Sequence, residues 1–246
     1  MKLLAAALGL ALAAPAAAQT VSPAVQAALA APARSDAEKA RDATRKPAEL
    51  LTFAGVKPGD KVADFIMGGG YWTPILSALV GRNGKVYAYQ PAEFISFRAA
   101  YGTEQDAAVK DRANVVASRQ ALTGVTFPEP LDVIMTVQNW HDFHLKIAPP
   151  GSAERMAAHI FSLLKPGGVF LVVDHAAVSG APLTVADTLH RIDPAKARAE
   201  IEKAGFVLEA QSPIYARPDD PKTQIVFDPA IRGKTDQFVY KLRKPQ

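Results

Sequence analysis

The sequence predicts an α/β protein with a doubly wound, mostly parallel seven-stranded sheet and an antiparallel terminal strand. Two patterns indicate this fold class. Short runs rich in β-branched and aromatic residues alternate with helix-length segments, which is the order of repeated strand–helix–strand units. The last two strand-like runs have no clearly amphipathic helix between them, so we expect them to pair antiparallel at one edge of the sheet.

The N-terminus is typical of an export signal. Lys2 gives a positive start, an apolar run follows, and three alanines precede Gln19 as a small-residue cleavage site. The sequence thus predicts a signal peptide at 1–18, a flexible Ala- and Pro-rich arm at 19–34, and a single domain at 35–246. This organisation indicates a periplasmic or secreted protein without a stable membrane anchor after cleavage.

Composition limits the classes of function. The 246 residues include no cysteine, which excludes disulfides, thiol catalysis and a lipoprotein anchor. The 28 basic and 24 acidic residues are spread along the chain, so charge gives no argument for nucleic-acid binding. Apolar residues make up 49% of the chain, enough for the core of one sizeable domain. The sequence does not indicate an oligomeric state.

The elements before residue 61 are helical. Ser35-Asp36-Ala37-Glu38 forms a capping box that begins a helix, and Pro47 suits the first turn of a second helix that ends at Gly55. Arg41 and Arg45 lie between these points. We interpret them as a solvated helix face, with contact to a ligand carboxylate as the alternative.

The stretch KVADFIMGGGYWT, Lys61 to Thr73, is where we expect a ligand. A buried strand at 62–66 carries Asp64 near its end, and Gly68-Gly69-Gly70 then lead into a helix that starts at Tyr71 and ends at Gly81. Glycines let a backbone approach a ligand closely, and a helix start offers free N–H groups. A tight turn without a ligand is the alternative. Thr73 replaces the third small residue of dinucleotide sites, which disfavours NAD.

The remaining elements continue the alternation. Six further strands are expected, at residues 86–89, 115–117, 131–137, 169–173, 206–211 and 237–242. Helices are expected at 93–113, from Ser152 to 164, and from Asp193-Pro194 to Gly205. Lys165-Pro166-Gly167-Gly168 is expected to form a turn.

Polar side chains follow several of these strands. Gln90 and Glu93 come after the second strand, where nucleotide-binding α/β folds carry an acid that holds ribose hydroxyls. Gln138, Asn139 and the aromatic-polar run to His144 follow the fourth strand, and Asp174-His175 end the fifth. Because the carboxyl ends of parallel strands share one edge, these side chains are expected to gather there.

Histidines at this edge have three interpretations. The first is a general base, for which the candidates are His141 and His175 with Asp142. The second is a metal site built from His141, Asp142, His144, Asp174 and His175. The third is a set of polar residues that only hold loops by hydrogen bonds. The run lacks an established metal signature such as HExxH, and we assign no metal ligand from the sequence. His190 also falls at this edge.

The chain resembles the class I S-adenosylmethionine-dependent methyltransferases over roughly residues 36–244. The resemblance rests on the seven strands with a terminal hairpin, a DxxxGxG pattern from Asp64, and LKPGG before the fifth strand. More narrowly, RKPAELL, GGGY, WHD, DHAA, HRIDPA and FDPAIRGKTDQFV are similar to segments of a group of exported bacterial predicted methyltransferases. The family's usual motif has a glycine where this chain has Ile66, and Gln90 stands at the position of the ribose acid.

The resemblance implies S-adenosylmethionine as cofactor and methyl transfer to a small-molecule acceptor. Asp64 and the glycines would line its methionine and ribose parts, Gln90 or Glu93 would meet the ribose, and residues 138–141 would lie beside the methyl group. The candidate cofactor-binding residues are Asp64, Gly68, Gly69, Gly70, Tyr71, Gln90, Glu93, Gln138 and Asn139. A non-catalytic periplasmic small-ligand-binding protein and a metal-dependent enzyme on the same fold are the alternatives.

Overall fold

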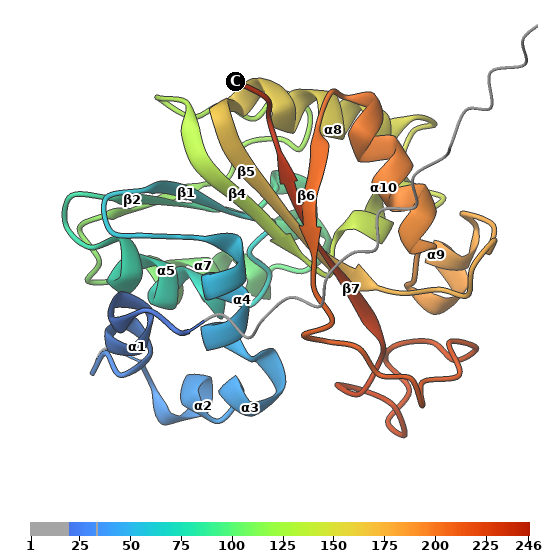
Figure 1. The fold of residues 1–246 in the computed structure, drawn as a ribbon, viewed down its shortest axis with the longest axis horizontal. Helices are drawn as coiled ribbons and strands as arrows, with labels where there is room; N and C mark the ends of the chain where they lie inside the picture. The colour runs from blue at the N-terminus through green and yellow to red at the C-terminus, as the bar shows by residue number, and fades with distance from the viewer. Residues whose placement is uncertain (1–19, 33) are drawn as a thin grey trace, which may run out of the picture.

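The computed structural model of the chain describes residues 20–32 and 34–246, so the signal peptide expected at 1–18 lies outside the described residues. The described part contains a seven-stranded sheet in the order β3-β2-β1-β4-β5-β7-β6 (Figure 1). Its strands are β1 (Lys61–Phe65), β2 (Lys85–Tyr89), β3 (Val115–Ser118), β4 (Leu131–Val137), β5 (Leu164–His175), β6 (Val207–Gln211) and β7 (Gln237–Arg243). The predicted seven-stranded α/β fold is confirmed.

The strand directions also agree with the prediction. Strand β7 is antiparallel to both of its neighbours, β5 and β6, while the pairs among β1 to β5 are parallel. The carboxyl ends of β1, β2, β4 and β5 therefore lie at one edge of the sheet. This shared edge is what brings the polar residues after each strand together.

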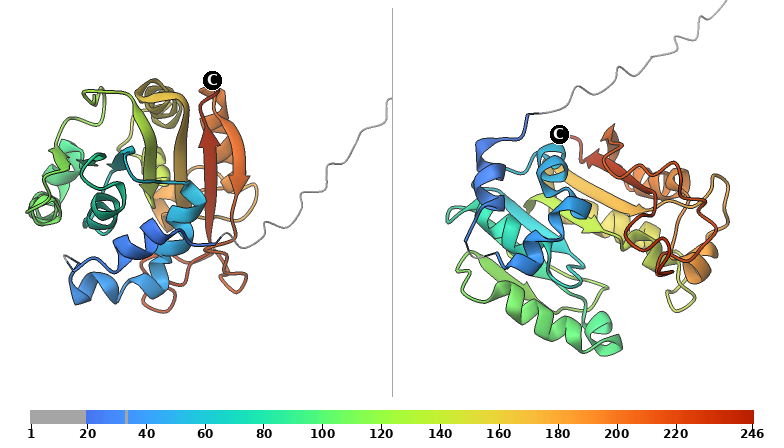
Figure 2. Two further views of the ribbon diagram at one scale, coloured as in Figure 1. Left: turned by 60° about the vertical axis from the view of Figure 1, so that its left-hand side comes forward. Right: turned by 90° about the horizontal axis from the view of Figure 1, so that it is seen from below.

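Helices cover both faces of the sheet (Figures 1 and 2). Helices α4 (Pro47–Ala54) and α5 (Trp72–Val80) pack on one face, and α8 (Ser152–Leu163) and α10 (Pro194–Lys203) pack on the other. Consecutive residues of β1 enter opposite cores, Val62 with the α4–α5 layer and Ala63 with the α8–α10 layer. Both faces are buried, which explains why the strands read as nearly continuous apolar runs.

The N-terminal helices differ from expectation at one point. Within the expected flexible arm at 19–34, residues Pro23–Leu29 form helix α1, capped by the side chain of Ser22. Val25 and Ala28 are buried in the same core as α4 and α5, so the prediction of a flexible arm is wrong for residues 23–29. An alanine-rich segment forms a helix here because it has an apolar face to bury.

Further helices complete the described chain. They are α2 (Asp36–Lys39), α3 (Asp42–Arg45), α6 (Ala92–Phe97), α7 (Ala100–Val109), the 3₁₀ helix η1 (Trp140–His144) and α9 (Val185–Leu189). The predicted capping box at Ser35 and Glu38 is present. The single helix expected at 93–113 is divided because Arg98 has an extended backbone. No helix among the described residues is long and apolar enough to cross a membrane.

The expected turn at 165–168 is instead an irregular part of β5. Gly167 N donates to Lys244 O at 2.9 Å, and Lys244 N donates to Gly168 O at 3.0 Å. The strand register against β4 shifts between Leu131 and Val133, which accommodates the irregular residues. The C-terminal residues thus provide pairing partners that could not be inferred from the local sequence. Helix α8 begins at Ser152 as expected, but Gly151 stands at its N-cap, and the Ser152 hydroxyl donates to Pro149 O.

A buried ion pair fixes the long segment between β6 and β7. The Arg191 guanidinium donates to both carboxylate oxygens of Asp220, at 2.7 and 3.1 Å, and its other bonds go to the carbonyls of Ala176 and Gln224. The side chains are 0% and 1% exposed. Asp220 also accepts from the N–H groups of Lys222 and Asp236, so one carboxylate ties this segment to the end of β5.

We predict that Asp220→Asn lowers the free energy of unfolding by about 3–5 kcal/mol, because it leaves the buried Arg191 charge without its counter-ion. The exposed neighbour Asp219 supplies a control, since Asp219→Asn should change it by less than about 0.5 kcal/mol. Urea denaturation of the two variants measures the difference. Equal stability of the two would contradict the role given to the pair.

Candidate functional site

Asp64 lies near the carboxyl end of β1, and its side chain is buried and not exposed at the sheet edge. Its carboxylate is buried, and Oδ2 accepts a hydrogen bond from Thr73 Oγ1 at 2.7 Å. Burial raises the pKa of Asp64 to about 6, against the opposing effect of the Thr73 bonds. Asp64 therefore anchors the start of α5 to the end of β1, which is the junction around the glycine turn.

The three glycines of this turn have different surroundings. Gly68 has φ +57°, and a Cβ there would meet no atom within 4 Å. A Cβ on Gly70 would lie 2.8 Å from the Cβ of Ala108 on α7, so Gly70 is required by helix packing. Gly69 is exposed beside the Glu104 carboxylate. Open space for a ligand thus lies at Gly68, and Gly70 serves the fold.

The end of β2 contributes Gln90 to the glycine turn. Gln90 is fully buried, and its Oε1 accepts from Gly68 N at 2.9 Å. Its Nε2 has no hydrogen-bond partner among the described residues, and such buried donors are uncommon. Glu93 instead accepts from Leu122 N with both carboxylate oxygens, at 2.9 and 3.1 Å. Of the two residues, only Gln90 touches the turn in the described structure.

Tyr71 points to the N-terminal helices. Its hydroxyl donates to Asp42 Oδ1 at 2.6 Å, and the guanidinium carbons of Arg41 and Arg45 lie 4.9 and 5.8 Å from its ring centroid. Asp42 in turn pairs with Arg34. Tyr71 thus holds α3 against the start of α5, and its ring lies beside two arginines near the carboxyl edge of the sheet.

These arginines line a cavity of about 280 Å³ at that edge. Arg232 and His175 line it as well, and none of the described residues that line it is acidic. Arg41 and Arg45 have no ion-pair partner within the described chain. Burial, and then the charge of Arg41, lower the pKa of Arg45. A cluster of cations without ion-pair partners, of which Arg45 is partly buried and Arg41 and Arg232 are exposed, favours an anionic ligand.

The turn after β4 is tied to the turn after β1. Asn139 Nδ2 donates to the Ile66 carbonyl at 3.0 Å, and also to Thr136 Oγ1 and the Val137 carbonyl. Gln138 Nε2 donates to Gln237 Oε1 at 3.1 Å, and Gln138 lines the cavity. Both Ile66 and Gln138 have a left-handed backbone, with φ +62° and +68°. Two strained residues therefore shape adjacent strand ends.

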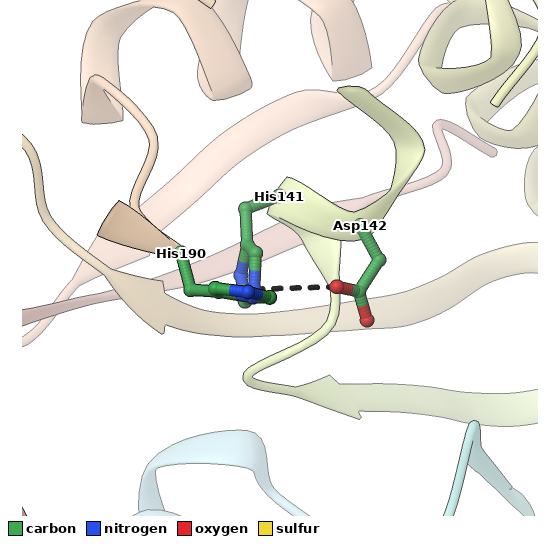
Figure 3. Close-up of side chains that lie close together, drawn as sticks. All are labelled: His141, Asp142 and His190. Carbon is green, nitrogen blue, oxygen red and sulfur yellow. Dashed lines mark hydrogen bonds and ion pairs between the residues drawn. The ribbon is translucent and has the colours of Figure 1, made fainter. Parts of the chain in front are cut away.

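His141 is held by the buried carboxylate of Asp174. Asp174 Oδ1 lies 2.8 Å from His141 Nδ1, and Oδ2 accepts from the His141 backbone N–H at 2.7 Å. The other ring nitrogen, Nε2, lies 3.3 Å from Asp142 Oδ1 and 3.2 Å from His190 Nδ1. Figure 3 shows the three side chains, His141 and Asp142 from η1 and His190 from the residue after α9, converging on one point.

The charges of these neighbours act on one another. Burial lowers the pKa of His141, but the charge and hydrogen bond of Asp174 and the charge of Asp142 outweigh it, and the net pKa is raised to about 9. Burial raises the pKa of Asp142 to about 6. Burial opposes ionisation of Asp174 too, yet His141 brings its pKa below the ordinary value.

The remaining histidines have separate surroundings. His175 Nδ1 lies 2.8 Å from Thr235 Oγ1, and burial lowers the pKa of His175 to about 3, so its ring is neutral at pH 7. His144 Nε2 lies 3.0 Å from Glu200 Oε2, which also accepts from Trp140 Nε1. His144 is thus held by the Glu200 carboxylate, while His175 lines the cavity.

Three further residues belong to the site, although the sequence did not list them as catalytic or cofactor-binding candidates. His190 joins His141 and Asp142, Phe227 packs on the His190 ring at 4.7 Å, and Arg232 lines the cavity. Each lies on a long connection between strands. The sequence placed His190 at this edge without a partner, and the signal for all three residues was that His190 begins HRIDPA and that Phe227 and Arg232 lie in FDPAIRGKTDQFV, two of the segments similar to the resembled group.

No family model matches the chain, and no curated protein matches it. Solved structures do. The chain is similar to a SAM-dependent methyltransferase from Aquifex aeolicus, with a TM-score of 0.56 and 20% identity over 83% of this chain and 93% of that one. It is also similar to the [4+2]-cyclase SpnF, with a TM-score of 0.54 and 15% identity over 82% and 81%.

A third similar structure is CrArsM, an arsenic(III) S-adenosylmethionine methyltransferase from Chlamydomonas reinhardtii, with a TM-score of 0.51 and 16% identity over 91% of this chain and 74% of that one. At these identities the similarity establishes the fold alone. The chain has the Rossmann-like methyltransferase fold. The narrower resemblance to an exported bacterial group remains a prediction.

We predict that Asp64→Asn removes a pH dependence of stability. The folded pKa of Asp64 lies about 2 units above 3.8, which corresponds to about 3 kcal/mol. Because the raised value favours the protonated form, the stabilisation is present below pH 4 and is lost as pH rises through 6. The unfolding free energy of the native chain relative to the variant should fall by that amount between pH 4 and pH 7. If the unfolding free energies of the native chain and of Asp64→Asn changed with pH in parallel, the raised pKa of Asp64 would be contradicted.

Proposed function

We propose that this protein is an S-adenosylmethionine-dependent methyltransferase with a small-molecule acceptor. The observation that carries the proposal is the pairing of Gly68 and Gln90 at the ends of β1 and β2. Gly68 leaves open space on a left-handed backbone, and Gln90 keeps a buried amide donor unpaired beside it. A ribose hydroxyl is an acceptor of the kind that this donor lacks, at the strand ends where nucleotide-like ligands bind in open α/β sheets.

Two arginines suit the carboxylate of the methionine part of S-adenosylmethionine. Arg41 and Arg45 have no ion-pair partner in the described chain, and both line the cavity, which has no acidic side chain among its described lining residues. They would therefore hold a ligand carboxylate. When bound, the cofactor supplies a methyl group on a sulfonium, a good leaving group. Rate acceleration then comes chiefly from alignment, for which effective molarities correspond to roughly 7–11 kcal/mol in favourable cases.

A hydrogen-bond acceptor is also available at the cavity. His175 lines the cavity, is neutral at pH 7 and contacts Thr235 through Nδ1. With Nδ1–H donating to Thr235, the lone pair of Nε2 can accept a hydrogen bond from the hydroxyl or amine of the methyl acceptor. Because burial lowers the pKa of His175 to about 3, the ring is a weak base at pH 7. We therefore give His175 the role of orienting the methyl acceptor, in preference to His141, whose ring nitrogens both have partners within the described chain.

The cavity volume of about 280 Å³ supports a small acceptor. We further propose that the protein is exported to the periplasm or beyond, on the strength of the apolar run after Lys2 and the alanines before Gln19. Cell fractionation with N-terminal sequencing tests the location. Recovery from the cytoplasm with Met1 or Lys2 at the N-terminus would contradict it.

Cofactor binding can be tested with a matched pair of glycine variants. We predict that the native chain binds S-adenosylmethionine and that Gly68→Ala weakens binding at least tenfold, because the new methyl fills the open space at the turn. Gly59→Ala is the control, since Gly59 also has positive φ, at +89°, and open space, but precedes β1 at the other edge. Isothermal titration measures both affinities.

Two results would separate the alternatives. No heat and no thermal shift with the native chain at millimolar cofactor would reject the proposed function. Binding of the cofactor without methyl transfer to any small molecule in a broad panel, with the products followed by mass spectrometry, would favour a non-catalytic ligand-binding protein. An equal effect of Gly68→Ala and Gly59→Ala would place the cofactor away from the glycine turn.

A further inference from the structure

His141, Asp142 and His190 present three potential ligand atoms to one point. His141 Nε2 lies 3.3 Å from Asp142 Oδ1 and 3.2 Å from His190 Nδ1, and the three atoms all lie within 4.8 Å of one another (Figure 3). In a tetrahedral site with metal–nitrogen distances of 2.0–2.1 Å, neighbouring ligand atoms are about 3.3 Å apart. Two of the three separations already have this value.

The hydrogen bonds of His141 decide which nitrogen is available. Asp174 Oδ1 accepts from Nδ1 at 2.8 Å, so the proton of a neutral His141 ring sits on Nδ1 and the lone pair of Nε2 faces the cluster. That lone pair then meets a carboxylate oxygen and another imidazole nitrogen. A proton on either ring or a metal ion can occupy the point where these three atoms meet. A carboxylate behind a ligating histidine is the usual outer partner in metal sites.

Asp142 lacks the partners that a largely buried carboxylate normally has. Its side chain is 17% exposed, and its one contact with a basic group in the described chain is the 3.3 Å approach to His141. No N–H or hydroxyl group of the described residues donates a regular hydrogen bond to it. Burying a carboxylate without donors costs free energy, and a bound cation would compensate that cost. Rotation of the Asp142 side chain would also bring its carboxylate closer to His190 Nδ1, which is the longest of the three separations.

His190 is held in place by its backbone. It ends α9 in a left-handed conformation with φ +51°, and its N–H donates to Ala186 O at 3.0 Å. The next residues are fixed to the end of β5, where Ile192 N donates to His175 O at 3.0 Å. A left-handed conformation is uncommon for a residue other than glycine, and such residues concentrate at functional sites. The ring of His190 is thus set against the ring of His141, with centroids 5.3 Å apart.

We propose that His141 Nε2, Asp142 and His190 Nδ1 bind a divalent transition-metal ion, with Asp174 orienting His141. Two imidazoles and one carboxylate favour ions such as Zn²⁺, Fe²⁺ or Co²⁺ over Mg²⁺ and Ca²⁺, which prefer oxygen ligands alone. Three protein ligands leave a position open for a further ligand. His175 and Phe227 line the cavity and flank the cluster, so this position adjoins the place where a small acceptor would bind.

The site is independent of the proposed methyl transfer, and its test needs no cofactor. The full chain without a histidine tag is freed of metal with a chelator and titrated with ZnCl₂ by calorimetry and thermal denaturation. We expect one equivalent of Zn²⁺ to bind and the melting temperature to rise by several degrees. Replacing Zn²⁺ with Co²⁺ should give visible absorption bands of low-coordinate cobalt with nitrogen and oxygen ligands.

Matched variants separate this site from incidental zinc binding. Asp142→Asn and His190→Gln should each weaken Zn²⁺ binding at least tenfold, and the zinc-dependent rise in melting temperature is measured against the metal-free form of the same variant. His144→Gln is the control from the same 3₁₀ helix, since His144 contacts Glu200 instead of the cluster. It should bind Zn²⁺ as the native chain does.

Three outcomes would overturn the proposal. The first is a native chain that binds none of Zn²⁺, Co²⁺ and Fe²⁺ at micromolar concentration, in which case a proton on His141 holds the cluster together. The second is unchanged affinity in both Asp142→Asn and His190→Gln. The third is a loss in His144→Gln as large as in Asp142→Asn. None of these results bears on the binding of S-adenosylmethionine.

Discussion

The buried carboxylate of Asp174 is the contact on which the geometry of the carboxyl edge depends. It is fully buried and accepts from His141 N, His141 Nδ1 and His175 N, at 2.7, 2.8 and 2.7 Å. A carboxylate removed from water costs several kcal/mol unless donors replace its hydration. These three bonds supply that replacement, and each of them fixes part of the site. They lock the turn after β4 to the end of β5, set the tautomer of His141, and leave His175 directed to the cavity.

Backbone strain at the neighbouring strand ends serves the same edge. Ile66 is β-branched and buried, yet has φ +62° at a position where the resembled family's motif has glycine. Gln138 has φ +68° after β4. Such conformations cost of order 1–3 kcal/mol each and persist only where the surroundings compel them. Asn139 provides part of that constraint through its bond to the Ile66 carbonyl, and burial of the Ile66 side chain in the core provides the rest.

The sequence predicted the sheet because its determinants are local. Apolar runs such as 131–137 and caps such as Asp193 with Pro194 specify elements without reference to the rest of the chain. The convergence of His141 with Asp174 also followed, because parallel strand ends share an edge. The sequence placed His190 at this edge, but its contact with His141 could not be predicted. It depends on a pairing of Ala176 with Ile192 and on the Arg191–Asp220 ion pair, both of which join segments with no periodic signal. Packing of α1 was equally hidden, because an alanine-rich segment reads as an arm until its partner face is known.

The two chemistries at this edge require different histidines. A ring that coordinates a metal through Nε2 and donates through Nδ1 has no lone pair left for a substrate proton, so His141 cannot be both ligand and base. His175 has one nitrogen on Thr235 and the other without a partner in the described chain, which leaves one lone pair able to accept a hydrogen bond from a substrate. Asp174 contacts both residues, through the His141 ring and the His175 backbone. Asp174 thus occupies the Nδ1 atom of His141 but bonds only the backbone of His175, so the His175 ring is left to contact a methyl acceptor.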